Sequence, residues 1–136
     1  MKTAIIALLL LIPEMSLAAT VTVFRGRPVI RITENAVARK REVIAASKAT
    51  KLECVITRVG ENYFWASRGN VPLALVEDSW GYETFSTPDG VGSIRIIKPI
   101  GKELASKMGD TEKTYDYIEH TVMGLGGTST YGVRIK

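Results

Sequence analysis

Short runs of β-branched and aromatic residues, separated by turn residues, fill the chain from Leu52 onward. The segment Leu52–Val59 predicts one strand, and Tyr63–Ser67 predicts the strand that returns beside it after a turn at 60–62. A third short strand is expected at Leu73–Val76, after the turn residues Gly69 and Asn70. This succession of strands and turns favours an antiparallel sheet.

A second hairpin is expected between residues 82–86 and 91–97. The intervening segment Thr87–Gly90 contains Pro-Asp-Gly, in which proline presets one backbone angle and the residues after it favour a turn. Residues 115–123 fit both a helical and a strand period, and their content of Tyr, Thr, Ile and Val favours a strand. A glycine-rich turn and a last strand at 130–135 follow.

Two helices are expected to accompany the sheet. After a strand over 21–32 that is broken by a bend, Thr33 offers an N-cap for an alanine-rich helix over Asn35–Ala49. A shorter helix over Pro99–Met108 begins with proline and ends before a glycine. Its apolar residues Ile100, Leu104 and Met108 share one face, which is expected to pack on the sheet as a lid. We therefore predict an α+β fold, an antiparallel β-sheet with one amino-terminal helix and one short helix packed on it.

The first eighteen residues have the pattern of a secretory signal peptide. Lys2 gives a basic start, Ala4–Ile12 is an unbroken apolar run, and Ser16 and Ala18 place small residues at the cleavage positions. A membrane span needs about 20 apolar residues, so this run is too short for one. We predict a signal peptide at 1–18 and a single globular domain at 19–136 that is exported, either periplasmic or secreted.

Cys54 is the single cysteine of the chain. The fold must therefore rest on packing, unless this residue forms a disulfide with a second chain. An exported protein without internal disulfides is typical of the bacterial periplasm. Because Cys54 lies in a predicted strand, a buried inert thiol is the favoured interpretation, and a reactive thiol is the alternative.

Basic residues are concentrated near the amino terminus. Residues 20–51 carry eight Lys and Arg side chains against Glu34 and Glu42, whereas the protein as a whole has a net charge of +4. Such a stretch gives a weak attraction to anionic surfaces, or forms a solvated helix face. Nucleic acid is not an expected partner, because export separates the protein from nucleic acid and because the basic residues are not interleaved with aromatic ones.

The sequence contains no recognisable catalytic or metal-binding motif. His120 is the single histidine and lacks a motif that would join it to a nucleophile, so a structural role is favoured. The acidic residues Glu77, Asp78 and Glu83 could supply a carboxylate pair for glycoside cleavage, although any domain of this size offers such pairs. In a hydrolase, Glu77, Asp78 or His120 would act as general acid or base. We predict no catalytic residue, no metal ligand and no cofactor.

Six of the ten aromatic residues fall within 63–85. On a strand, Tyr63 and Trp65 share one face. If this face is outward, with Arg68 and Asn70 beside it, it would form a platform for a sugar ring, a peptide or a base. The alternative is that both faces of this strand are covered and the aromatic residues belong to the core.

The segment Cys54–Leu73 and the run Tyr115–His120 resemble parts of small signal-peptide-bearing proteins of Gram-negative bacteria that have no assigned activity. The resemblance implies export and one compact domain, and it implies no catalytic residue.

From these features we predict a non-catalytic exported domain that binds an envelope component or a protein partner through Tyr63, Trp65, Arg68 and Asn70. The alternative is a small hydrolase that acts on envelope polymers.

Overall fold

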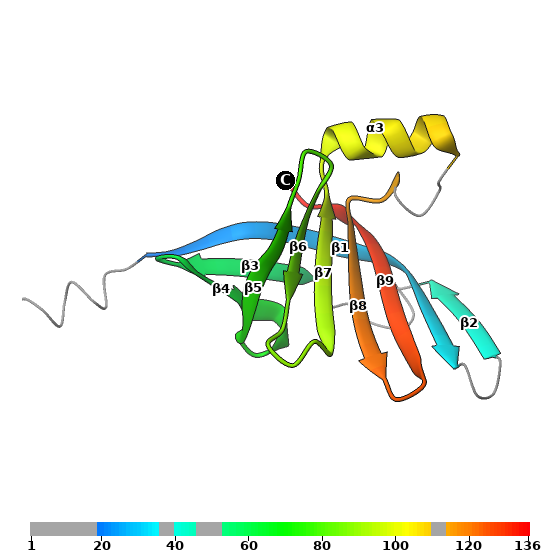
Figure 1. Ribbon diagram of the computed structural model, residues 1–136, viewed down its shortest axis with the longest axis horizontal. Coiled ribbons are helices and arrows are strands. Elements are labelled where there is room, and N and C mark those ends of the chain that lie inside the picture. Colours follow the sequence, from blue (N-terminus) through cyan, green and yellow to red (C-terminus); the bar gives the residue numbers. More distant parts are fainter. Residues whose placement is uncertain (1–18, 36–39, 46–52, 110–113) are drawn as a thin grey trace, which may run out of the picture.

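The computed structural model describes residues 19–35, 40–45, 53–109 and 114–136 (Figure 1). In these ranges eight antiparallel strands close into a barrel, and a ninth strand, β2, extends the sheet beside β1. The strands are β1 Thr20–Asn35, β2 Lys40–Ala45, β3 Cys54–Val59, β4 Asn62–Trp65, β5 Val71–Asp78, β6 Tyr82–Ser86, β7 Gly92–Ile97, β8 Tyr117–Met123 and β9 Gly126–Arg134. The helices are the 3-10 turn η1, Ala66–Arg68, and the α-helix α3, Pro99–Met108.

The barrel closes through β1. Strands β3 to β9 follow one another as a meander, each paired with the next. The first part of β1 pairs with β3, from Thr20 opposite Val59 to Gly26 opposite Cys54. Its second part pairs with β9, from Gly26 to Asn35, with a shift of register between Pro28 and Ile30. A strand of 16 residues is long enough to serve both neighbours in succession.

The predicted α+β fold is therefore wrong, and so is its amino-terminal helix. Asn35 ends β1, and Lys40–Ala45 forms β2, which pairs antiparallel with β1. Residues 36–39 and 46–49 of the predicted helix lie outside the described residues. Helix propensities differ by only about 0.7 kcal/mol per ordinary residue, and pairing with a long neighbouring strand outweighs the preference of alanine. The predicted bend in 21–32 is instead a register shift within one continuous strand.

The two predicted hairpins and the carboxy-terminal strands are confirmed. The β3–β4 hairpin turns at Gly60 and Glu61, and the β6–β7 hairpin turns at 87–91. In the second turn the backbone N–H of Gly90 donates to the carbonyl of Thr87, and Gly90 has a φ of 74°. The carboxylate of Asp89 accepts hydrogen bonds from the Thr87 hydroxyl and the Val91 amide. The ambiguous segment 115–123 forms strand β8 from Tyr117 onward.

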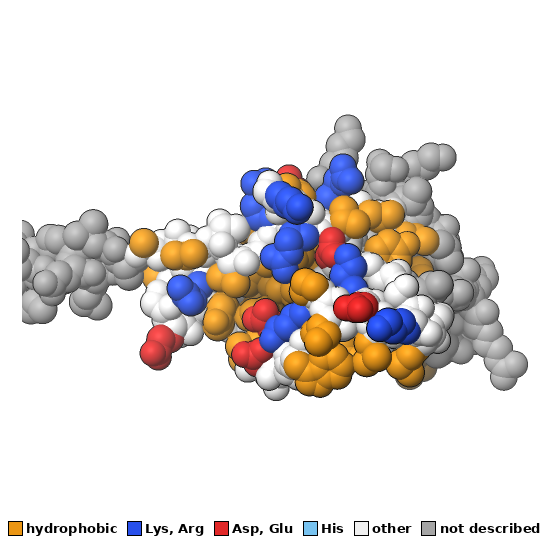
Figure 2. All heavy atoms as spheres, turned by 90° about the horizontal axis from the view of Figure 1, so that it is seen from above, with side chains coloured by type: hydrophobic (Ala, Val, Ile, Leu, Met, Phe, Trp, Pro, Cys, Tyr) orange, Lys and Arg blue, Asp and Glu red, His pale blue; other side chains and the backbone are white. Residues whose placement is uncertain are grey.

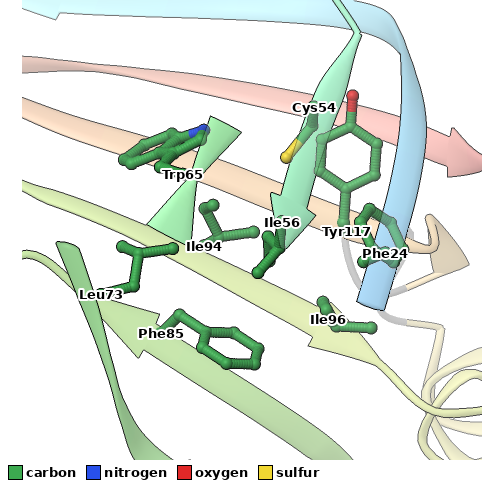
Figure 3. Close-up of a cluster of buried hydrophobic side chains, with 9 residues drawn as sticks. All are labelled: Phe24, Cys54, Ile56, Trp65, Leu73, Phe85, Ile94, Ile96 and Tyr117. Carbon is green, nitrogen blue, oxygen red and sulfur yellow. The ribbon is translucent and has the colours of Figure 1, made fainter. Parts of the chain in front are cut away.

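Alternate residues of the strands point into the barrel and form an apolar core (Figure 3). The core consists of buried side chains from seven strands, namely Phe24, Cys54, Ile56, Trp65, Leu73, Phe85, Ile94, Ile96 and Tyr117. The Phe24 and Tyr117 rings meet edge to face, with centroids 5.3 Å apart. These side chains fill one part of the interior, so the barrel is packed there rather than hollow.

Two glycines make room for Tyr117 where β1 and β9 join. A Cβ atom on Gly26 would lie closer than 3.0 Å to the Tyr117 ring, as would one on Gly132. The Cβ on Gly132 would also crowd the carbonyl oxygen of Arg27 on the neighbouring strand. The ring can therefore lie against the seam of the barrel because both positions lack a side chain.

Helix α3 lies across the end of the barrel at which β7 ends (Figure 1). Its predicted bounds are confirmed, with Pro99 in the first turn and Gly109 in the left-handed conformation at its end. The predicted packing face is wrong. Gly101 packs closely against the backbone of Gly81, and Ala105 is buried, because only small side chains fit there.

The apolar stripe of α3 faces outward instead. Ile100, Leu104 and Met108 are 53%, 43% and 76% exposed. Seen from the side on which α3 lies, hydrophobic and basic side chains are interspersed over the surface (Figure 2). The helix is attached to the barrel through Lys102, whose Nζ lies 2.5 Å from Oδ1 of Asp116.

Candidate functional site

A partly open cavity of about 230 Å³ borders the apolar core, and the core residue Tyr117 is part of its lining. We call it the polar cavity, because eight of its ten lining residues are charged residues, serine or threonine. The other two are Pro28 and the core residue Tyr117. They come mainly from β1, η1, β8 and β9: Pro28, Arg31, Glu53, Ser67, Arg68, Tyr117, Glu119, Thr121, Thr128 and Thr130.

The alternation of β8 and β9 explains why polar residues line this part of the barrel. Tyr117 points into the core, so Glu119 and Thr121 on the same strand point to the same side. Their partners across the β8–β9 pair are Thr130 and Thr128. The inner face of the barrel thus changes from apolar to polar along the length of β8.

Strand β1 brings Arg31 to the same wall. Arg31 pairs with Thr130 in the β1–β9 register, and Thr33 pairs with Thr128. The hydroxyls of Thr33 and Thr128 lie 3.4 Å apart, which shows that these positions share one face. The register shift after Pro28 allows Pro28 and Arg31, three residues apart, both to line the cavity.

Four charged side chains line the polar cavity, and three of them have partners. Oε2 of Glu53 lies 2.6 Å from Nη2 of Arg25, which is outside the cavity. Oε2 of Glu119 lies 3.5 Å from Nη2 of Arg68. Arg31 forms no ion pair with any acidic residue of 19–35, 53–109 or 114–136, whose side chains are described. Each carboxylate of the cavity is therefore balanced, and one guanidinium is not.

Arg68 is held over the core by the 3-10 turn that follows β4. Its guanidinium carbon lies 4.8 Å from the centre of the Trp65 ring, a favourable cation–π arrangement. The neighbouring Ser67 hydroxyl accepts a hydrogen bond of 3.0 Å from the backbone N–H of Val55 on β3. Gly69, with a φ of 73°, ends the turn. These contacts hold Ser67 and Arg68 in place on the side of the cavity that faces β8.

Two titratable core residues beside the cavity, Cys54 and Tyr117, are held neutral. Burial raises the pKa of the Cys54 thiol, and the nearby negative charge of Glu119 and its hydrogen bond raise it further. Burial also raises the pKa of the Tyr117 hydroxyl, with additional contributions from Cys54 and Glu119. A neutral buried thiol is a poor nucleophile. The cavity consequently offers charged and hydroxyl groups for binding but no activated sulfur.

The structure places the four predicted binding residues in different settings. Trp65 is 2% exposed and belongs to the core, with its ring nitrogen buried and lacking a hydrogen-bond partner within the described part of the chain. Tyr63 is half-buried and meets Phe85 edge to face, with centroids 5.0 Å apart. Arg68 lines the polar cavity, and Asn70 is exposed in the turn before β5. Trp65 and Arg68 are thus in contact, but Tyr63 and Trp65 form no outward platform.

The residues considered for hydrolysis do not line the polar cavity. Glu77 accepts a hydrogen bond from the Thr84 hydroxyl, and Asp78 pairs with Lys98 at 2.9 Å. Glu83 lies opposite Asp78 in the β5–β6 pair. Nδ1 of His120 lies 3.0 Å from the Ser129 hydroxyl, and His120 alternates with the cavity residues of β8, so it faces the outside of the barrel.

Sequence reasoning missed most of the cavity residues. Arg31 was one of several basic residues in a charged stretch, and Glu119 lay beside the more conspicuous His120. The available signal was the two-residue period of Tyr117, Glu119 and Thr121, which places a carboxylate on the same face as an aromatic core residue. That period becomes informative only once β8 is known to border a closed interior.

In the described ranges, no group of three or more His, Cys, Asp and Glu side chains could hold a metal ion. No helix in those ranges is long and apolar enough to cross a membrane.

Comparison with protein-family models, curated proteins and solved structures found no match to this chain.

Proposed function

We propose that the protein is a non-catalytic exported domain that binds a small polar component of the cell envelope in the polar cavity. Export is proposed from the pattern of residues 1–18. The observation that carries the binding proposal is the cavity of about 230 Å³, lined by charged and hydroxyl side chains within an otherwise packed barrel.

The size of the cavity supports a ligand no larger than a monosaccharide. Drug-sized ligands occupy pockets of about 300–1,000 Å³, and this cavity is smaller. At about 30 Å³ per water molecule, it corresponds to roughly eight waters. An acyl chain is disfavoured, because it would cover the guanidinium of Arg31, which has no ion-pair partner among the described side chains, with hydrocarbon.

The chemistry of the cavity favours binding over hydrolysis. The buried thiol of Cys54 has a raised pKa, and so does the phenol of Tyr117. His120 is on the outer face of β8 and cannot act as a base in the cavity.

The β3–β4 hairpin, which carries Tyr63 and Trp65, retains an indirect role in the proposed function. Trp65 supports the guanidinium of Arg68, which lines the cavity. Of the four residues predicted from the sequence, Arg68 is proposed to act in the cavity, where it pairs with Glu119, and Trp65 is proposed to position the Arg68 side chain.

Thermal unfolding in the presence of a ligand panel tests this proposal. The panel comprises monosaccharides, amino acids and hydroxy acids at millimolar concentration, with decanoate as an apolar comparison. Thr121→Phe fills the cavity from β8, and Val122→Phe is the matched control on its outer face, where Val122 is exposed. Circular dichroism checks that both variants fold.

We expect at least one polar compound to raise the midpoint of unfolding of the wild type and of Val122→Phe, but not of Thr121→Phe. If Thr121→Phe is unfolded, Thr130→Leu replaces it as the cavity variant. Stabilisation by decanoate alone, stabilisation insensitive to the cavity variants, or no stabilisation by any compound would contradict the proposal.

A further inference from the structure

We infer that the ligand of the polar cavity is a monoanionic carboxylate that also carries hydroxyl groups, and that Arg31 is the residue that binds its carboxylate. This inference rests on the proposed function, because it names the chemical class of the ligand for the same cavity.

The charge balance of the cavity points to one negative charge. The carboxylate of Glu53 is paired with Arg25, and that of Glu119 is paired with Arg68. Arg31 is left with no ion-pair partner among the acidic residues of 19–35, 53–109 and 114–136, whose side chains the structure describes. A charged group in a polar but partly enclosed site is stabilised by an opposite charge that replaces the lost water. An anion of single charge would complete the pairing.

The same balance favours a carboxylate over a phosphate monoester. A phosphate monoester carries about 1.5 to 2 negative charges near neutral pH. Its second charge would face Glu119, whose side chain is only 13% exposed. A carboxylate matches the single surplus charge, and its two oxygens fit the fork of a guanidinium.

The neighbours of Arg31 indicate the rest of the ligand. Thr130 is its partner across the β1–β9 pair, and Thr128 and Thr121 continue the row of hydroxyls along the cavity wall. Each hydroxyl can both donate and accept a hydrogen bond, which suits the hydroxyls of a sugar or a polyol. Acidic sugars and open-chain sugar acids share this combination of one carboxylate and several hydroxyls.

Arg68 contributes by neutralising Glu119 rather than by holding the carboxylate. Removal of its charge in Arg68→Gln would leave Glu119 to repel an anion. Removal of both charges in the double variant Arg68→Gln/Glu119→Gln would restore the balance. The single variant is therefore expected to bind a carboxylate more weakly than the double variant does.

Titration calorimetry with matched sugars tests the inference. D-Galacturonate and D-galactose differ at one carbon, which carries a carboxylate in the first and a hydroxymethyl group in the second. Arg31→Gln removes the proposed anchor. Arg27→Gln is the matched control, because Arg27 is an exposed residue of the same strand and does not line the cavity. D-Gluconate distinguishes an open-chain acid from a cyclic one.

We expect wild type and Arg27→Gln to bind galacturonate or gluconate at least about tenfold more tightly than galactose, as charged hydrogen bonds of ordinary strength imply. Arg31→Gln should lose this preference. If galactose binds as tightly, or if Arg31→Gln keeps the preference, the inference is wrong. If only neutral panel members bind, and Thr121→Phe blocks them, the inference fails while the proposed function stands. If no panel member binds, both fail.

Discussion

The substitution Gly132→Ala tests how the barrel closes. The added Cβ would lie closer than 3.0 Å both to the Tyr117 ring and to the Arg27 carbonyl oxygen. The ring is buried among core residues and the carbonyl belongs to a paired strand, so neither can move without disturbing the seam between β1 and β9. Overpacking of a core typically costs about 1–3 kcal/mol. Because one of the two neighbours is backbone, we expect a cost of about 3 kcal/mol.

Urea unfolding followed by tryptophan fluorescence measures this loss. For a denaturant dependence of about 2 kcal/mol per molar urea, a loss of about 3 kcal/mol lowers the unfolding midpoint by about 1.5 M. Gly81→Ala is the matched control, since its Cβ would lie 3.7 Å from its nearest neighbour, an ordinary contact. The control should change stability by less than about 0.5 kcal/mol. Equal midpoints for Gly132→Ala and wild type would show that Tyr117 does not occupy the seam.

Three further outcomes are expected. Partial burial alone would raise the pKa of Asp116, but hydrogen bonds from Lys102 and the Arg134 amide, together with the positive charges of these two residues, lower this pKa. The ionised Asp116 therefore stabilises the fold above the ordinary pKa of 3.8. This stabilisation is lost as the pH falls toward the lowered pKa. Asp116→Asn should unfold more readily than wild type at pH 6, and the difference should shrink in acid; a constant difference across that range would contradict the ion pair. Cys54 should resist iodoacetamide at pH 8 in the folded protein and react once urea unfolds it, because burial keeps the thiol protonated; rapid labelling of folded protein would refute this. Mass spectrometry of protein recovered from the periplasm should show a chain that begins at residue 19, whereas an intact Met1 would mean that the segment 1–18 is retained.

The parts of the fold that local sequence determines were predictable. The β6–β7 hairpin follows from its Pro-Asp-Gly turn, and α3 follows from Pro99 at its start and Gly109 at its end. Barrel closure was not predictable, because it depends on the pairing of β1 with β9, whose residues are about a hundred positions away in the sequence. Local periodicity carries no information about that pairing. The expected helix after Asn35 is instead replaced by strand β2, which pairs with β1, the strand that precedes it in the sequence.

The candidate site, like the fold, was predictable only where local sequence determines it. The sequence indicated that Tyr63 and Trp65 share a strand face, but not whether that face points inward. Closure of the sheet directs Trp65 into the core and leaves Arg68 above its ring. Closure also places Arg31 from the amino-terminal strand beside Thr130 from the last strand. The polar cavity thus combines residues from opposite ends of the sequence that no local pattern connects.

Proton–nitrogen NMR spectra of labelled protein, recorded during titration with D-galacturonate, would locate the ligand directly. We expect the largest shifts at the amides of Arg31, Glu119, Thr128 and Thr130, which surround the polar cavity, with smaller changes on α3 and on the outer face of the β3–β4 hairpin. Large shifts confined to α3 or to that outer face, with the amides of the cavity unchanged, would contradict the assignment of the polar cavity as the binding site.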